Sequence, residues 1–220
     1  VVPLFLDSTE KYKSPVELTK VSEVDRLIQD RKPFFLILGR MCYYKGLDNI
    51  LKATKRNQTQ GFNNVFNVVL AGKVVDFEAK RIISQLSDHH DILIIDRILR
   101  EEEKIYLLQS CSALLFPSNK NTEAFGIVQL EALATGKPVV NFNLPTGVPS
   151  VSLDGKTGLT LDLDDYEAIG DLLAGRGGYQ ERLDAIQDSL ICDHLETFSK
   201  AKVTDTMLSR YQLFTEDNIG

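Results

Sequence analysis

The chain is poor in cysteine and histidine, and neither residue type occurs at metal-ligand spacing. Among its 220 residues there are three cysteines and three histidines. Cys42, Cys111 and Cys192 are odd in number and widely separated, which disfavours both a disulfide framework and a zinc site. This cysteine usage fits a reducing cytosol, and we expect neither a metal ion nor a cofactor.

Long apolar runs and an excess of positive charge are also missing. No run approaches the roughly 20 apolar residues of a membrane-spanning helix, and the first residues lack the basic flank of a signal peptide. The net charge of −6 is opposite to that expected of a nucleic-acid-binding domain. The chain does not begin with methionine, so we expect a piece of a longer protein.

Short apolar runs instead alternate with amphipathic segments. The apolar runs predict strands at 34–38, 65–71, 92–95, 113–116 and 138–142 and one from 158. Helical spacing predicts helices at 22–31, from 46, at 76–87, 100–110, 126–135, 166–174, 179–193 and 199–214. This alternation is typical of an α/β fold with a doubly wound, mostly parallel sheet and right-handed crossovers.

The stretch 113–140 carries the strongest functional pattern. A strand closed by Pro117 leads into a polar loop and then a helix that begins near Gly126 and stops at Gly136. The free N–H groups of a helix start attract anions, and here they belong to Ala124, Phe125, Gly126 and Ile127. We therefore expect an anion site at this helix start.

Two carboxylates flank this anion site. Glu123 precedes the helix and Glu131 lies two turns along it, so the two are about 12 Å apart and cannot share a proton. An anion site between carboxylates suggests a ligand with both phosphate and hydroxyl groups, such as a nucleotide sugar. The alternative is that both glutamates are solvated surface residues.

A second candidate phosphate site follows the predicted strand 34–38. Gly39 and Arg40 lie at the carboxyl end of this strand, where open α/β sheets bind ligands, and Lys45 and Gly46 open the next helix. A guanidinium group can grip a diphosphate with two hydrogen bonds, while an ammonium group acts as a mobile charge. Alternatively, both cations are solvated loop residues.

These residues resemble those of a known enzyme family. The run Glu123-Ala-Phe-Gly-Ile-Val-Gln-Leu-Glu131, followed by Ala-Leu-Ala-Thr-Gly-Lys-Pro-Val-Val, resembles the Glu-x7-Glu signature of retaining family-4 glycosyltransferases with the GT-B fold. Gly39-Arg40 and Lys45-Gly46 resemble the Gly-Arg and Lys-Gly pairs of the same enzymes. The resemblance implies a Rossmann-like, carboxyl-terminal lobe that binds a nucleoside diphosphate sugar, with a UDP-sugar or GDP-sugar expected. The implied enzyme transfers the sugar to an acceptor hydroxyl with retention.

The resemblance also implies roles for single residues. Glu131 would hold the ribose hydroxyls, and the implied catalytic residues are Glu123 at the donor sugar, with Arg40 and Lys45 stabilising the leaving diphosphate without a metal. The other implied donor-binding residues are Gly39, Gly72, Arg97, Ile98, Ala124, Phe125, Gly126 and Ile127. The sequence departs from the family at Gly72-Lys73-Val74, where Gly-x-Gly is usual, and at 95–98, where Phe-x-Gly is usual. The base preference therefore does not transfer.

On this resemblance the chain divides into three parts. Residues 1–33 would be a lead-in segment from a missing amino-terminal lobe, 34–198 the nucleotide-sugar-binding domain, and 199–220 a crossover helix and tail. The acceptor, a glycan or lipid-linked glycan, would bind the missing lobe, so the chain alone is expected to be inactive. Such an enzyme would serve polysaccharide or glycoconjugate synthesis in the cytoplasm, or at the inner face of the membrane through the missing lobe.

Two other functions remain open from the sequence. The chain could be a non-catalytic nucleotide-sugar-binding subunit that works beside a separate acceptor-binding chain. It could also be a phosphate-binding or signalling domain of flavodoxin-like type, in which the two glutamates are incidental and ribose is not preferred.

Overall fold

The structure, a computed structural model, describes residues 4–6, 8–16, 24, 25, 28 and 32–216, with side chains as far as Ser209. Within this part the strands are β1 (Phe34–Leu38), β2 (Asn67–Ala71), β3 (Ile92–Ile95), β4 (Ala113–Phe116), β5 (Val139–Phe142) and β6 (Gly158–Leu161). They form one sheet in the order β3-β2-β1-β4-β5-β6, and every pairing is parallel. The order reverses between β1 and β4, which creates a topological switch point.

The sheet is buried on both faces. Along β1, Phe34, Leu36 and Leu38 belong to one apolar core, while Phe35 and Ile37 belong to the other. This division follows from the alternation of side chains along a strand. Uninterrupted apolar strands such as β1 therefore require helices on both sides of the sheet.

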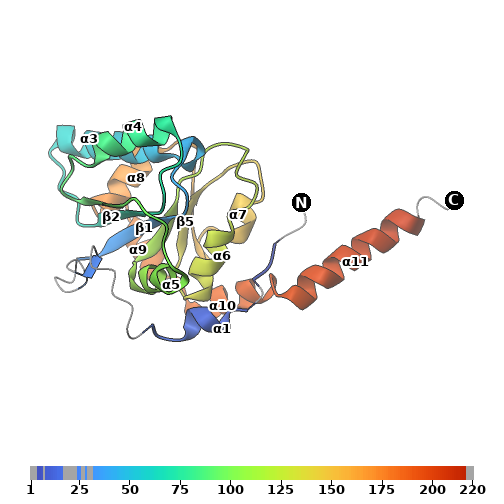
Figure 1. Ribbon diagram of the computed structural model, residues 1–220. Coiled ribbons are helices and arrows are strands. Elements are labelled where there is room, and N and C mark those ends of the chain that lie inside the picture. Colours follow the sequence, from blue (N-terminus) through green and yellow to red (C-terminus); the bar gives the residue numbers. More distant parts are fainter. Residues whose placement is uncertain (1–3, 7, 17–23, 26–27, 29–31, 217–220) are drawn as a thin grey trace.

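The helices supply those two layers. One face is covered by α1 (Glu10–Lys13), α5 (Glu101–Ser110), α6 (Ile127–Ala134), α7 (Val148–Val151) and α10 (Asp188–Glu196). The other is covered by α3 (Leu47–Gln60), α4 (Phe77–Leu86), α8 (Tyr166–Leu173) and α9 (Tyr179–Asp184). Figure 1 shows α3 and α4 on the side of the sheet opposite to α5 and α10. The predicted doubly wound α/β fold is confirmed.

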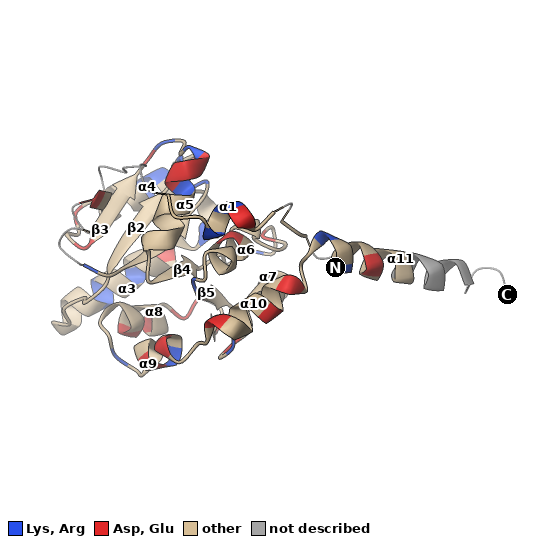
Figure 2. Ribbon diagram, turned by 90° about the horizontal axis from the view of Figure 1, so that it is seen from below, with Lys and Arg blue, Asp and Glu red and all other residues tan. Residues whose placement is uncertain are grey.

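The last helix, α11 (Lys200–Glu216), leaves this body. Figure 1 and Figure 2 both show it extending away from the sheet and its helices. Val203 in its first turn is buried, whereas the side chains of residues 204–209 are exposed. No helix in the described part of the chain has the length and apolar character needed to cross a lipid bilayer.

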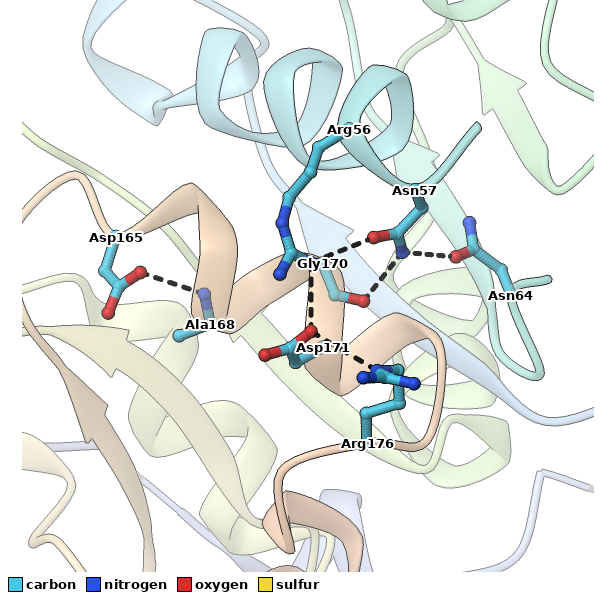
Figure 3. Close-up of polar contacts among 8 residues, drawn as sticks. All are labelled: Arg56, Asn57, Asn64, Asp165, Ala168, Gly170, Asp171 and Arg176. Atoms are coloured by element: carbon cyan, nitrogen blue, oxygen red, sulfur yellow. Dashed lines mark hydrogen bonds and ion pairs between the residues drawn. The ribbon is translucent and has the colours of Figure 1, made fainter. Parts of the chain in front are cut away.

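A polar network joins α3 to α8 (Figure 3). The guanidinium of Arg56 donates to Asp171 over 2.9 Å, and the Asn57 amide donates to the Gly170 carbonyl and to Asn64, each over 2.7 Å. The helices come close at Gly170, where an added Cβ would lie 2.9 Å from Asn57 Oδ1. This network holds α8, and with it the end of the β6–α8 loop, against the rest of the fold.

Several predicted elements need correction. The single helix predicted over 179–193 is wrong, because α9 ends at Asp184 and α10 begins at Asp188. Ile186, between them, packs against both apolar cores, and this burial interrupts the helical pattern. Helix α1 lies in a stretch for which no helix is predicted from the sequence. The predicted helix 22–31 falls mostly outside the described residues, of which 24, 25 and 28 are helical.

Candidate functional site

The loops that follow β1 and β4 meet at the switch point of the sheet. The first contains the 3-10 helix η1 (Tyr43–Lys45) and ends at Gly46, whose φ is 65°. A Cβ at Gly46 would lie 1.8 Å from the Pro117 carbonyl oxygen, so only glycine permits this approach. The Asn119 amide also donates to the Tyr44 carbonyl over 3.0 Å. The two loops that carry the predicted site residues are thereby locked together.

This approach pairs two of the predicted catalytic side chains. Lys45 Nζ lies 2.6 Å from Glu123 Oε2, and the two side chains are only 12% and 13% exposed. The hydroxyl of Ser118 donates to the same carboxylate oxygen over 3.2 Å. Lys45 Nζ also lies 4.7 Å from the centre of the Phe116 ring. Glu123 is therefore held in place by a neighbouring cation and a hydroxyl group.

The start of α6 has the geometry expected of an anion site. Gly126 has a φ of 76°, and an added Cβ would lie 2.4 Å from the Phe116 ring. In the described part of the chain, the backbone N–H groups of 124–127 donate to no protein acceptor. The buried Gln129 side chain donates to the Phe125 carbonyl over 2.8 Å, and the Gly147 amide donates to the Ala124 carbonyl over 2.8 Å. The carbonyl groups of Ala124 and Phe125 are thus held by hydrogen bonds, while the backbone N–H groups of 124–127 remain available to a ligand.

A cavity of about 340 Å³ joins these parts. Its lining residues are Leu38, Gly39, Arg40, Tyr44, Lys45, Lys104, Glu123, Gly126, Ile127, Val128 and Glu131. Arg40 is exposed and has no carboxylate partner among the described residues. The size is within the range of small-molecule sites, and the lining combines cations with two carboxylates. The cavity can therefore receive a ligand that carries both anionic groups and hydroxyl groups.

Glu131 reaches this cavity from the second turn of α6 and is half-buried. Its Oε1 accepts a hydrogen bond from the Tyr12 hydroxyl over 3.0 Å. Burial raises the pKa of Glu131, while the positive charge of Lys104 and the Tyr12 hydrogen bond act in the opposite direction. Glu131 lines the cavity, and its carboxylate is a hydrogen-bond acceptor for ligand hydroxyl groups.

Three other predicted donor-binding residues, Arg97, Ile98 and Gly72, do not line the cavity. The Arg97 guanidinium donates to both oxygens of Glu103 over 2.9 and 3.0 Å. Ile98 is 82% exposed. Gly72 packs against the backbone, since an added Cβ would lie 2.0 Å from the Gly39 carbonyl oxygen. Direct contacts of these residues with a donor remain predictions.

The motif residues Ala124 and Phe125 differ in their surroundings. Ala124 is exposed, whereas the Phe125 side chain is buried and packs edge-on against Phe198, with the ring centres 5.9 Å apart. Phe125 therefore anchors the loop in the core and can meet a ligand only through its backbone.

Sequence reasoning missed several side chains of this edge. Lys104 lines the cavity from α5, which no motif marks, and Tyr12 lies 119 positions from Glu131 in the chain. A third loop was also missed: Asp164 has a φ of 61° and accepts hydrogen bonds from the side chains of Asn49 over 2.8 Å and Asn119 over 2.7 Å. No local pattern marks these long-range contacts.

The fold and this cavity together define an α/β lobe with a cavity at its switch point, lined by cations, carboxylates and backbone of the α6 start. Comparison with known proteins gives the family. The chain belongs to the family described as glycosyl transferases group 1, which it matches over residues 20–175. The predicted family resemblance is thereby confirmed.

Curated relatives carry consistent names. The chain is 29% identical over 136 residues to the O-antigen chain mannosyltransferase C of Escherichia coli, covering 62% of this chain and 34% of the relative. It is 36% identical over 129 residues to the D-rhamnosyltransferase WbpZ of Pseudomonas aeruginosa, covering 58% of this chain and 32% of the relative. The chain thus spans about a third of the length of these relatives.

Solved structures share the fold over nearly the whole chain. A sucrose-phosphate synthase from Thermosynechococcus elongatus gives a TM-score of 0.71 at 17% identity, covering 98% of this chain and 52% of that protein. The Anabaena protein HepE in complex with UDP gives 0.69 at 16% identity, covering 93% of this chain and 55% of that protein. At these identities the likeness concerns the fold alone.

Proposed function

We propose that this chain is the carboxyl-terminal, donor-binding lobe of a GT-B glycosyltransferase. The complete enzyme would transfer a sugar from a nucleoside diphosphate sugar to an acceptor hydroxyl with retention at the anomeric carbon, in polysaccharide or glycoconjugate synthesis. The observation that supports this best is the single cavity shared by Arg40, the free amides of the α6 start and Glu131. These groups match the diphosphate and the ribose of one ligand.

Each part of the cavity has a chemical role in this proposal. Arg40 and the α6 amides would bind the diphosphate, and Glu131 would accept hydrogen bonds from the ribose hydroxyls. Lys45 is paired with Glu123, and both would lie beside the donor sugar and the bond that breaks. Negative charge grows on the diphosphate as it leaves, so fixed positive groups lower the barrier without requiring a metal.

The donor is a UDP-sugar or a GDP-sugar. One relative is named as a GDP-mannose-dependent mannosyltransferase, and solved structures of similar fold are complexes with UDP and UDP-glucose. These names support the two nucleotides about equally. The base preference stays open, because residues 95–98 depart from the Phe-x-Gly pattern that the family resemblance leads us to expect before the base-contacting loop.

The acceptor would bind a second lobe. The chain covers 55% of HepE and 52% of the sucrose-phosphate synthase, which leaves room in these proteins for another domain of similar size. We therefore propose that this lobe binds the donor but transfers no sugar by itself. A non-catalytic subunit that partners a separate acceptor-binding chain would have the same cavity and remains the alternative.

Calorimetric titration of the chain with UDP, GDP and ADP tests the proposal, with pyrophosphate and flavin mononucleotide as further ligands. Arg40→Ala should weaken binding of the preferred diphosphate about 10- to 150-fold, the loss expected for about 1.5–3 kcal/mol from a charge-assisted hydrogen bond. The matched control is Arg81→Ala, which removes an exposed arginine of α4 that does not line the cavity.

Glu131→Gln should weaken nucleosides and nucleoside diphosphates but leave pyrophosphate affinity unchanged, because its proposed partner is ribose. Equal affinity for pyrophosphate and nucleoside diphosphates would show that the cavity has no ribose site, and preference for the flavin would contradict a nucleoside diphosphate site. Unchanged nucleotide affinity in both Arg40→Ala and Glu131→Gln would show that this cavity is not the donor-binding site.

A further inference from the structure

The lead-in segment before β1 contributes a side chain to the environment of Glu131. Tyr12, on α1, is only 2% exposed, and its hydroxyl donates to Glu131 Oε1 over 3.0 Å. Figure 1 shows α1 at the end of the body near α10. The contact joins residues that are 119 positions apart. A buried phenol placed on one oxygen of a carboxylate restricts the orientation of that carboxylate.

This tyrosine is itself held by α5. The Gln109 side chain donates to the carbonyls of Tyr12 and Ser14, each over 2.9 Å. Lys11 Nζ lies 2.7 Å from Glu101 Oε1 at the start of the same helix. Backbone and side-chain contacts thus fix α1 on both sides of Tyr12, so its hydroxyl has little freedom to leave Glu131.

Tyr12 approaches Glu131 from outside the proposed donor cavity. Glu131 lines that cavity, whereas Tyr12 does not. Tyr12 instead lines a separate cavity of about 580 Å³ beside Gln109 and Leu133. Only one carboxylate oxygen is used, and Oε2 of Glu131 has no hydrogen-bond partner among the described residues. The hydroxyl therefore occupies one oxygen of the carboxylate and leaves the other available to a ligand.

We propose that Tyr12 is a positioning residue for nucleotide binding, which fixes Glu131 so that its second oxygen meets the ribose of the donor. The inference rests on the ribose-binding role proposed for Glu131. It extends the donor site to a residue of α1, which precedes the first strand of the sheet.

The same contact affects the charge of Glu131. The charged and titratable groups around it are Tyr12 and Lys11 on α1, Glu101 and Lys104 on α5, and Arg40, Lys45 and Glu123 around the cavity. Burial raises the pKa of Glu131, and the Tyr12 hydrogen bond opposes that rise by stabilising the ionised form. Without the hydroxyl, Glu131 takes up a proton at a higher pH and becomes a poorer acceptor for ribose.

The test is Tyr12→Phe, which removes the hydroxyl and keeps the buried ring. We expect the affinity for the preferred nucleoside diphosphate to fall about five- to tenfold, the scale of one hydrogen bond, and pyrophosphate affinity to stay unchanged. The pH at which nucleoside diphosphate binding is lost on acidification should rise. The matched control is Tyr106→Phe, because that hydroxyl also donates to a carboxylate, Asp25, over 3.1 Å but outside the cavity.

The outcomes are separable from those of the proposed function. Measured in parallel, Glu131→Gln reports on the ribose site itself. If it weakens nucleosides while Tyr12→Phe retains the parent affinity and pH profile, the positioning role is overturned. Tighter binding by Tyr12→Phe also overturns it, because Tyr12 would then compete with the ligand. If Glu131→Gln has no effect on nucleosides, the ribose site, and not only the role of Tyr12, is wrong.

Discussion

A single glycine shapes the anion site at the residue scale. Gly126 has a φ of 76°, and an added Cβ would lie 2.4 Å from the Phe116 ring. Gly126→Ala therefore combines backbone strain with a steric clash, and we expect it to lower the free energy of unfolding by about 2–4 kcal/mol. Diphosphate affinity should fall as well, because relief of the clash moves the amides. Chemical denaturation and calorimetric titration measure the two effects.

Gly136→Ala is the matched control for this prediction. Gly136 follows the same helix with a φ of 75°, but an added Cβ there would meet no atom within 4 Å. We expect only the backbone cost, about 1–2 kcal/mol, and unchanged ligand affinity. Equal destabilisation by the two substitutions, with equal affinity, would contradict the role assigned to the Phe116 contact.

Single residues also mark the limit of prediction from the sequence. The sequence placed Arg40, Lys45, Glu123 and Gly126 in the loops after two parallel strands and Glu131 on the helix that follows, and all five line one cavity. It gave no sign that Lys45 pairs with Glu123, or that Tyr12 meets Glu131. Those contacts span 78 and 119 positions and depend on how loops pack.

At the scale of elements, Glu103 secures the start of α5. Its carboxylate accepts from the Arg100 amide over 2.8 Å and from Arg97, and these contacts lower its pKa to about 2. A carboxyl whose pKa is lowered by folding adds stability above its unfolded pKa, near 4.5, and this stability is lost as pH falls towards 2. Glu103→Gln should therefore cost about 1–2 kcal/mol at pH 7, since Arg97 is partly exposed.

The pH dependence distinguishes this role from a general effect of charge removal. The difference between the parent and Glu103→Gln should shrink between pH 4.5 and 2, as measured by urea denaturation across that range. Glu102→Gln removes an exposed carboxylate from the same turn and serves as the control. A constant difference across this range would show that the stabilisation does not come from the ionised carboxylate.

The elements themselves were predicted unevenly. Strands were found because buried parallel strands are continuous apolar runs, and β3 and β4 have the predicted bounds. The break between α9 and α10 was missed, since Ile186 is placed by two cores that local periodicity does not reveal. The hydrogen bonds of Asn57 and Arg56 to α8 (Figure 3) were equally invisible, because they join residues more than 100 positions apart.

For the whole molecule, the alternation of strands and helices was enough to predict the fold class. Parallel strands need crossover helices, and right-handed crossovers place those helices on both faces. The packing of α11 could not be predicted in the same way. Apolar residues on a helix indicate a buried face, but in α11 Met207 is 45% exposed and Leu208 is 58% exposed. These apolar residues have no covering element in the described part of the chain.

We expect α11 to contribute to the complete enzyme rather than to this lobe. Deletion of residues 204–220 should change the melting temperature by no more than about 2 °C and leave nucleotide affinity unchanged, because the described side chains after Val203 are exposed. In a protein that joins this lobe to an acceptor lobe, the same deletion should reduce sugar transfer, whereas the substitution of an exposed residue elsewhere, Arg81→Ala, should not.

Sugar transfer in that protein is measured by the release of nucleoside diphosphate from the donor sugar. Full transfer after the deletion would show that α11 has no part in joining the lobes. A large loss of melting temperature in the isolated chain would show instead that α11 packs on this lobe.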